Sequence, residues 1–135
     1  GKWRGHPTHQ IQEAQQPAKC YTTLLFKDQN LTYMRRAFED DIAMVKIWAS
    51  KMLSLTSLPI IIMHAQVDAR ALLQPIDPES RLQYRAVDFV RGGYWKKWPH
   101  YRYMHTKLQT WTSPCTQALF VDYDSVPLRN FDKVL

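Results

Sequence analysis

Two aspartates near the end of the chain have the type and spacing of a metal-binding pair. Asp122 and Asp124 follow the apolar run 118–121, which predicts a strand. Side chains alternate along a strand, so both carboxylates can point to the same side. Such a pair forms a hard, all-oxygen half-site for Mg²⁺ or Mn²⁺, which takes its other ligands from water and substrate phosphates. The bound ion would neutralise a diphosphate as that group leaves.

An Asp-x-Asp tripeptide by itself more often lies in a solvated turn than at a metal. Two features of the sequence favour the metal site. An apolar strand runs directly into Asp122, and an alternation of predicted strands and helices precedes it. In parallel sheets of this kind, ligands bind beyond the carboxyl ends of the strands, where the two carboxylates would lie.

The elements that position this pair are predicted from hydrophobic periodicity. Apolar runs predict strands over 21–26, 60–63, 81–90 and 118–121. Apolar residues then recur every three or four positions, which is typical of one helix face: Met34, Phe38, Ile42, Val45, Trp48, Met52 and Leu55. Asp68 is expected to cap a short helix that Pro75 and Pro78 end. A last helix is expected over 104–111, with Met104, Leu108 and Trp111 on one face.

This order predicts an α/β fold, with a mostly parallel sheet flanked by helices on both faces. Neither a GxGxxG nor a GxxxxGK[ST] motif follows the first strand, so a dinucleotide fingerprint and a P-loop are both absent from that place. The alternation thus predicts a Rossmann-like architecture that lacks the two commonest nucleotide-binding signatures.

Composition and charge narrow the choice of partners. The chain has 135 residues, is 45% hydrophobic and carries a formal net charge of +6, which suits a folded domain with a polyanionic ligand. That polyanion could be nucleic acid, a membrane surface or a nucleotide diphosphate. The aromatic and basic stretch 94–103 could stack bases, but it matches no known RNA-binding signature, and packing under the sheet explains the same residues. Nucleic-acid binding is therefore the weaker alternative.

Three consecutive segments resemble the glycogenin-like retaining glycosyltransferases (glycosyltransferase family 8). In that family a T-K-L-x-x-W helix precedes a strand ending in D-x-D, and an L-x-N-[IF]-D segment follows. Here the matching residues are Thr106-Lys107-Leu108-Gln109-Thr110-Trp111, then Asp122-Tyr123-Asp124, then Leu128-Arg129-Asn130-Phe131-Asp132. Residues 21–25 are similar to the opening V-T-L-type strand. The resemblance covers roughly residues 20 to 135 and is most specific over 106–132.

The resemblance implies the GT-A fold, a nucleotide-sugar-binding α/β domain, of which residues 20–135 would form the truncated, donor-binding half. The activity implied is metal-dependent transfer of a sugar from a UDP-sugar to a hydroxyl acceptor on a glycan or protein, with retention of configuration. Residues 1–19 are polar and predict a linker or stalk, and a membrane anchor could lie upstream. Because the family's third metal ligand and acceptor half do not occur in this sequence, we expect this piece alone to be inactive.

The family's site residues carry over position by position. Asp122 and Asp124 would hold Mn²⁺ or Mg²⁺ together with the donor ribose and diphosphate. Lys107 would lie near the donor, where a point positive charge suits a phosphate or sugar hydroxyl; the alternative is an ordinary solvated helix lysine. Leu24 and Leu25, at the end of the first strand, would line the uridine pocket.

Two departures from the family pattern bear on this assignment. Phe26 and Lys27 stand where the family often has small polar residues, so recognition of the base is expected to differ. Tyr123 replaces the Ala or Ser that is common in the middle of D-x-D; we expect it either to pack between strand and loop or to narrow the pocket. A non-catalytic GT-A-like binding protein is the alternative function, and metal-dependent donor hydrolysis would separate the two.

Cys20 and Cys115 leave two interpretations open. In the family, the first strand and the D-x-D strand are parallel neighbours, so both cysteines would lie at the amino ends of adjacent strands. A spacing of about 4.8 Å allows a disulfide, but Cys115 falls in a turn that the sequence does not position, which slightly favours two free thiols. The acceptor pattern Asn30-Leu31-Thr32, with the stalk-like residues 1–19, favours the Golgi or secretory pathway over the cytoplasm.

Overall fold

Four parallel strands form the sheet of this computed structural model, which describes residues 19–27, 37–89 and 106–135. The strand order is β3-β2-β1-β4, and every pairing is parallel. The bounds are β1 Lys19–Phe26, β2 Ile60–Ala65, β3 Leu82–Ala86 and β4 Gln117–Phe120. The predicted α/β class, with a parallel sheet flanked by helices, is confirmed, and it is consistent with a Rossmann-like half-domain.

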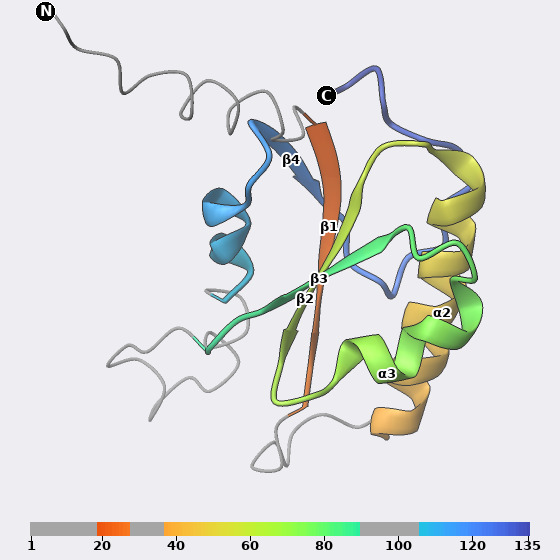
Figure 1. The fold of residues 1–135 in the computed structure, drawn as a ribbon, viewed down its shortest axis with the longest axis vertical. Coiled ribbons are helices and arrows are strands. Elements are labelled where there is room, and N and C mark those ends of the chain that lie inside the picture. The colour runs from red at the N-terminus through yellow and green to blue at the C-terminus, as the bar shows by residue number, and fades with distance from the viewer. Residues whose placement is uncertain (1–18, 28–36, 90–105) are drawn as a thin grey trace, which may run out of the picture.

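The helices lie on both sides of this sheet (Figure 1). The helical elements are α2 Phe38–Leu55, α3 Ala69–Leu73 and the short 3₁₀ helices η1 Gln74–Ile76 and η3 Lys107–Thr112. Parallel crossovers are right-handed. The β1-to-β2 and β2-to-β3 connections step in one direction along the sheet, so α2 and α3 cover one face. The connection to β4 steps back past β1, so η3 lies on the other face. The order reverses between β1 and β4, which makes that point the topological switch point.

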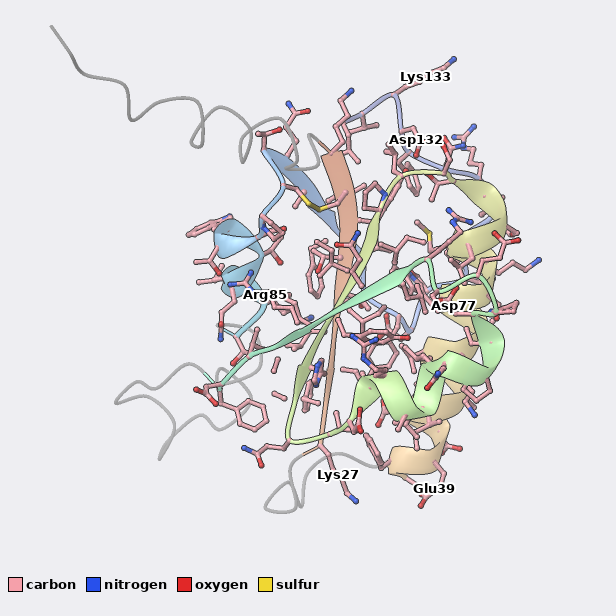
Figure 2. The ribbon with its side chains drawn as sticks, viewed as in Figure 1. Lys27, Glu39, Asp77, Arg85, Asp132 and Lys133 are labelled. Carbon is pink, nitrogen blue, oxygen red and sulfur yellow. A yellow bond between two sulfur atoms is a disulfide. The ribbon has the colours of Figure 1, made fainter. Side chains whose placement is uncertain are left out.

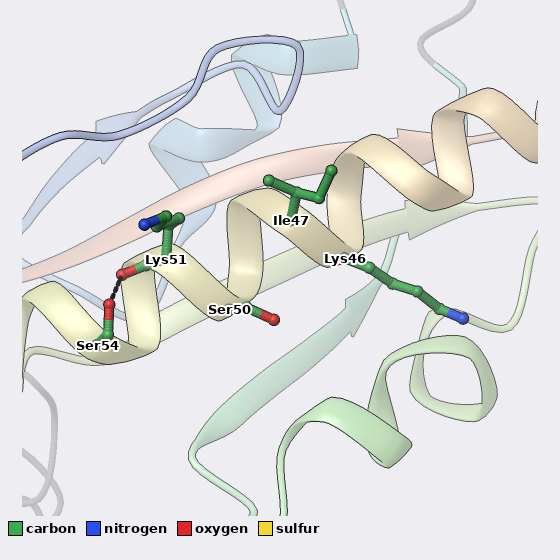
Figure 3. Close-up of a pocket in the computed structure, with 5 residues that line it drawn as sticks. All are labelled: Lys46, Ile47, Ser50, Lys51 and Ser54. Atoms are coloured by element: carbon green, nitrogen blue, oxygen red, sulfur yellow. Dashed lines mark hydrogen bonds between the residues drawn. The ribbon is translucent and has the colours of Figure 1, made fainter.

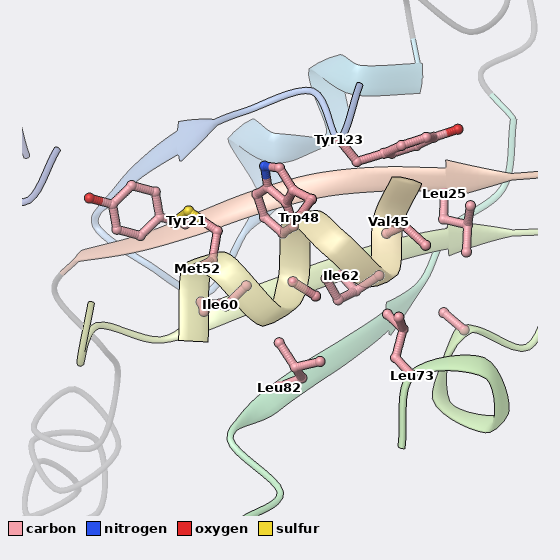
Figure 4. Close-up of a cluster of buried hydrophobic side chains, with 12 residues drawn as sticks. Tyr21, Leu25, Val45, Trp48, Met52, Ile60, Ile62, Leu73, Leu82 and Tyr123 are labelled. Carbon is pink, nitrogen blue, oxygen red and sulfur yellow. The ribbon is translucent and has the colours of Figure 1, made fainter. Parts of the chain in front are cut away.

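The core lies between the sheet and α2 (Figure 4). Tyr21 and Leu25 of β1 point towards α2, where Trp48 and Met52 are fully buried. Thr22, one position along β1, takes the opposite face. Burial of β1 on both faces explains why its sequence is a nearly continuous run of β-forming residues rather than an alternation.

The predicted long helix is confirmed over its described part. α2 buries Val45, Trp48 and Met52 and ends at Leu55, ahead of Pro59. Its last carbonyl groups, which have no partner within a helix, are bonded from elsewhere in the chain. The Arg81 guanidinium donates to Leu53 O at 2.7 Å and to Thr56 O at 2.6 Å.

The short helix α3 begins as predicted. The Asp68 carboxylate accepts the amide N–H of Ala71 at 3.2 Å, which confirms the N-cap. The chain then continues through Pro75 as η1 before it leaves helical conformation. Proline is tolerated there because the first turn of a helix needs no amide donor at that position.

Three predictions differ most from the observed structure. The strand expected over 81–90 is shorter, since β3 ends at Ala86. The helix expected over 104–111 is, in its described part, the 3₁₀ helix η3, whose Trp111 is 83% exposed. Thr110 Oγ1 donates to Lys107 O at 2.8 Å, and such local hydroxyl bonds compete with regular helix. Lys19, expected in the linker, belongs to β1.

Several expectations fall on residues outside the described ranges. These are the linker 1–18, the acceptor pattern at Asn30, the start of the long helix at Met34 and the aromatic stretch 94–103. No helix in the described ranges is both long and apolar enough to cross a bilayer.

The last residues of the chain form hydrogen bonds with both the amino end of β1 and the end of α2. Tyr21 OH donates to Asp132 Oδ1 at 2.6 Å, and Thr56 Oγ1 donates to the same carboxylate at 2.9 Å. Asn130 Nδ2 donates to Leu55 O at 2.9 Å. Figure 2 shows Asp132 and Lys27 at opposite ends of the sheet. The family-like segment 128–132 therefore closes the end of the sheet that faces away from Asp122.

The Tyr21 hydroxyl should make stability fall in alkali. Burial, assisted by the hydrogen bond to Asp132, raises the pKa of Tyr21 to about 12 from 10.0. Above pH 10 the unfolded chain releases this proton while the folded chain keeps it, so stability is lost as pH rises through this window. Melting temperatures from pH 9 to 12 should fall more steeply for the wild type than for Tyr21→Phe. Parallel curves would contradict this account of Tyr21.

A disulfide joins Cys20 to Cys115, so the slightly favoured alternative of two free thiols was wrong. Cys20 pairs with Ala118 in register, and the segment between η3 and β4 brings Cys115 back beside β1, with the two Cα atoms 6.1 Å apart. Figure 2 shows the bond beside β1 and β4. The disulfide therefore links the amino ends of β1 and β4, the two strands that form the switch point.

Candidate functional site

The two candidate metal ligands lie in a turn just beyond β4. β4 ends at Phe120, one residue earlier than predicted. Ser125 then bonds back to Asp122 O through its amide at 3.3 Å and its hydroxyl at 2.7 Å. We call residues 122–125 the acidic turn. Asp122 and Asp124 are exposed while Tyr123 between them is buried, so it is this burial pattern, not strand alternation, that places both carboxylates on the solvent side.

The acidic turn lies at the switch point of the sheet. Beyond β4, Val121 N still donates to Thr22 O of β1 at 2.9 Å, whereas β1 continues to Phe26. The turn therefore follows β4 alongside the second half of β1. In open α/β sheets the crevice at such a point, beyond the carboxyl ends of the strands, is where ligands bind.

Lys107 and Asp122, which the resemblance assigned separately to the donor site, are in contact. Lys107 Nζ lies 2.7 Å from Asp122 Oδ1, and the side chains are 35% and 53% exposed. The same ammonium lies 5.4 Å from the centroid of the Phe120 ring. An exposed pair of this kind contributes only about 0–1 kcal/mol to stability. Its main consequence is local, because the pair places an ammonium group directly beside the Asp122 carboxylate.

The element that carries Lys107 is anchored to β3. Arg85 Nη1 donates to Gln109 O at 3.3 Å and Nη2 donates to Thr112 Oγ1, while Gln109 Nε2 donates to Asp88 O. These bonds hold η3 against the sheet (Figure 2, where Arg85 is labelled). Arg85 was not predicted from the sequence, in which a charged side chain within a predicted strand was the only signal for it.

Tyr123 packs inward, into the core beneath α2, rather than between the strand and the loop. Its ring belongs to the core cluster beneath α2, and its hydroxyl donates to Asp41 Oδ1 at 2.8 Å. Asp41 stands in the first turn of α2 and is 5% exposed. No sequence pattern singled out Asp41, since its neighbours Glu39 and Asp40 are also acidic and only the fold distinguishes it from them.

The two leucines assigned to the uridine pocket are buried on opposite faces of β1. Leu25 belongs to the core beneath α2, and Leu24, 2% exposed, faces the η3 side. Their side chains therefore leave β1 on opposite sides, and the uridine pocket that the resemblance implies stays a prediction. The residues at the carboxyl end of β1 are Phe26, whose ring meets that of Phe89 edge-on at 6.1 Å, and the exposed Lys27.

The acidic turn suits a metal that takes part of its shell from a ligand. Asp122 and Asp124 offer hard oxygen atoms, which Mg²⁺ and Mn²⁺ prefer. Among the described residues no group of three or more His, Cys, Asp or Glu side chains is placed to hold a metal. Mg²⁺ is commonly bound through one or two carboxylates plus substrate phosphates. The residues present fit that mode, and Lys107 adds a positive charge beside it.

A hollow of about 440 Å³ lies elsewhere, on the surface of α2 (Figure 3). It is lined by Lys46, Ile47, Ser50, Lys51 and Ser54. All five residues belong to one helix, and none is a carboxylate, thiol or imidazole. This hollow therefore provides no metal ligands, and the acidic turn remains the candidate site.

No protein-family model matches the chain, and no curated protein matches it.

Proposed function

We propose that this chain is the donor-binding half of a metal-dependent glycosyltransferase that moves a sugar from a UDP-sugar to a hydroxyl acceptor. The observation that carries the proposal is the 2.7 Å contact between Lys107 Nζ and Asp122 Oδ1, beside the exposed Asp124, at the switch point of the sheet. Retention of configuration and the choice of UDP rest on the resemblance of residues 106–132 to the glycogenin-like enzymes.

Each residue of the site has a separate task in this proposal. Asp122 and Asp124 would hold Mn²⁺ or Mg²⁺, and the bound ion would stabilise the charge that develops on the departing UDP. Lys107 supplies a second positive charge to a phosphate oxygen or sugar hydroxyl. Tyr123 keeps the acidic turn against α2. Phe26 and Lys27, at the end of β1, are the described residues best placed to meet the nucleoside.

The disulfide supports a place in the secretory pathway. Disulfides persist in oxidising compartments and are rare in the cytosol, and Cys20 and Cys115 are joined. A Golgi enzyme would meet both sugar nucleotides and glycan acceptors there. The acceptor pattern Asn30-Leu31-Thr32 points the same way.

UDP should bind weakly unless Mn²⁺ or Mg²⁺ is present. The acidic turn alone is negatively charged, and without the ion it would repel a diphosphate. Calorimetric titration of UDP into the protein, first with MnCl₂ and then with excess chelator, measures this directly. Uridine is the matched control ligand, because it has the base and ribose but no diphosphate.

We expect the chelator to weaken UDP binding and to leave uridine binding unchanged. Equal affinity for UDP in both conditions would contradict the metal role. Metal-dependent binding of UDP-sugars without any hydrolysis or transfer by the complete protein would instead identify a non-catalytic binding protein with the same site.

A further inference from the structure

The acidic turn is held in place by a buried contact that reaches across the domain. β4 pairs with β1 only as far as Phe120 and Val121, so the sheet does not hold the carboxylates. The bonds of Ser125 to Asp122 O are local and shape the turn without fixing its direction. The Lys107–Asp122 pair is half exposed. Of the residues in the turn, only Tyr123 is buried.

The Tyr123 ring lies in the core beside α2, where Figure 4 shows it near Val45 and Trp48. Its hydroxyl donates to Asp41 Oδ1 at 2.8 Å, between residues that are 82 positions apart. Asp41 is a buried carboxylate in the first turn of a helix, where the helix dipole stabilises negative charge.

This contact sets the direction of both metal ligands. Within the acidic turn the Tyr123 side chain is buried, whereas the Asp122 and Asp124 side chains on either side of it are exposed. While the Tyr123 side chain stays buried, Asp122 remains in contact with Lys107 and Asp124 remains exposed to solvent. If the Tyr123 side chain turned, both carboxylates would move together.

We propose that Asp41 is a positioning residue for the metal site, acting on Asp122 and Asp124 through the Tyr123 hydroxyl. The inference rests on the proposed function where Mn²⁺ affinity is measured. The positioning of the acidic turn can be measured without a metal, by amide hydrogen exchange. Partners that orient metal ligands typically contribute about 10–100-fold to metal affinity. Tyr123, the middle residue of this Asp-Tyr-Asp, would thus orient the two aspartates rather than only separate them.

The chain offers a matched control for this test. Tyr21 is also a buried tyrosine that donates to an aspartate, Asp132, at 2.6 Å, but it does so at the amino end of the sheet, away from the acidic turn. Tyr123→Phe and Tyr21→Phe each remove one hydroxyl and leave the ring. Mn²⁺ affinity, measured by electron paramagnetic resonance, should fall about 10–100-fold in Tyr123→Phe and stay unchanged in Tyr21→Phe.

Variants of Asp41 test whether it acts through Tyr123. Asp41→Asn keeps an oxygen that accepts the hydroxyl, so it should stay close to the wild type in Mn²⁺ affinity. Asp41→Leu removes the acceptor at similar volume and should match Tyr123→Phe. A double variant that combines Asp41→Leu with Tyr123→Phe should then lose no more Mn²⁺ affinity than either single variant, because both substitutions remove the same contact. Additive losses, or Mn²⁺ binding in Tyr123→Phe equal to that of the wild type, would overturn the inference.

Amide hydrogen exchange separates this inference from the proposed function. Exchange over residues 121–125 should rise in Tyr123→Phe and not in Tyr21→Phe, whether or not a metal binds. If the wild type fails to bind Mn²⁺ but this local rise is seen, the proposed function is wrong and the positioning role of Asp41 stands. If exchange in the turn is the same in both variants, the positioning role is wrong.

Discussion

Under the proposed function, replacing Asp124 with asparagine should strongly slow sugar transfer while leaving the fold intact. Asp124 is exposed and outside the core, so the substitution removes a ligand charge without disturbing packing. A metal at a departing phosphate contributes several kcal/mol to transition-state stabilisation. Since about 1.4 kcal/mol corresponds to a factor of ten in rate, kcat should fall about 100- to 1000-fold. Steady-state kinetics at saturating Mn²⁺ would measure it.

Asp40→Asn is the matched control for this substitution. Asp40 is also exposed, and the change removes the same charge from the first turn of α2. Its kcat should stay close to that of the wild type, and both variants should melt within a few degrees of it. A wild-type rate in Asp124→Asn would exclude Asp124 as a metal ligand and contradict the proposed site.

Loss of the disulfide should give the largest change in stability. The bond closes a loop with a sequence separation of 95 residues, which restricts the unfolded chain strongly. Disulfides typically contribute about 2–4 kcal/mol, which for a domain of this size corresponds to a melting temperature lower by roughly 10 °C. The double variant Cys20→Ala with Cys115→Ala should show this loss in calorimetry.

A reducing agent separates the bond from the two side chains. The wild type should melt at a lower temperature once the disulfide is fully reduced, as verified by mass spectrometry, whereas the double variant should show no dependence on the reductant. If full reduction leaves the wild-type melting temperature unchanged, the bond does not stabilise the fold in the way described.

Elements with strong periodicity were predictable from the sequence. The stripe through Val45, Trp48 and Met52 predicts α2, because a helix that packs on one face needs an apolar residue every three or four positions. The continuous β-forming runs predict β1 and β2, because a strand that is buried on both faces needs such residues at nearly every position. η3 was mispredicted: Leu108 and Trp111 have helical spacing, yet both are exposed, and local hydroxyl bonds of threonine favour the tighter turn.

The candidate site was predictable only where its chemistry is local in the sequence. Asp122 and Asp124 follow a strand, and this spacing is visible without a structure. The contact of Lys107 with Asp122 and that of Tyr123 with Asp41 join residues 15 and 82 positions apart, and they depend on where η3 and α2 pack. The disulfide was undecided for the same reason, because the position of the turn that holds Cys115 is set by the fold.

Paramagnetic broadening by Mn²⁺ tests most directly whether the acidic turn holds a metal and a diphosphate. In amide NMR spectra of the protein with UDP, Mn²⁺ should selectively broaden the signals of residues 122–125, with weaker effects at Phe26 and Lys27. Signals of Lys19 and Gln117, at the amino ends of β1 and β4, should be broadened least. Broadening centred on the α2 hollow around Ser50 and Ser54, or no selective broadening at all, would contradict the proposed site.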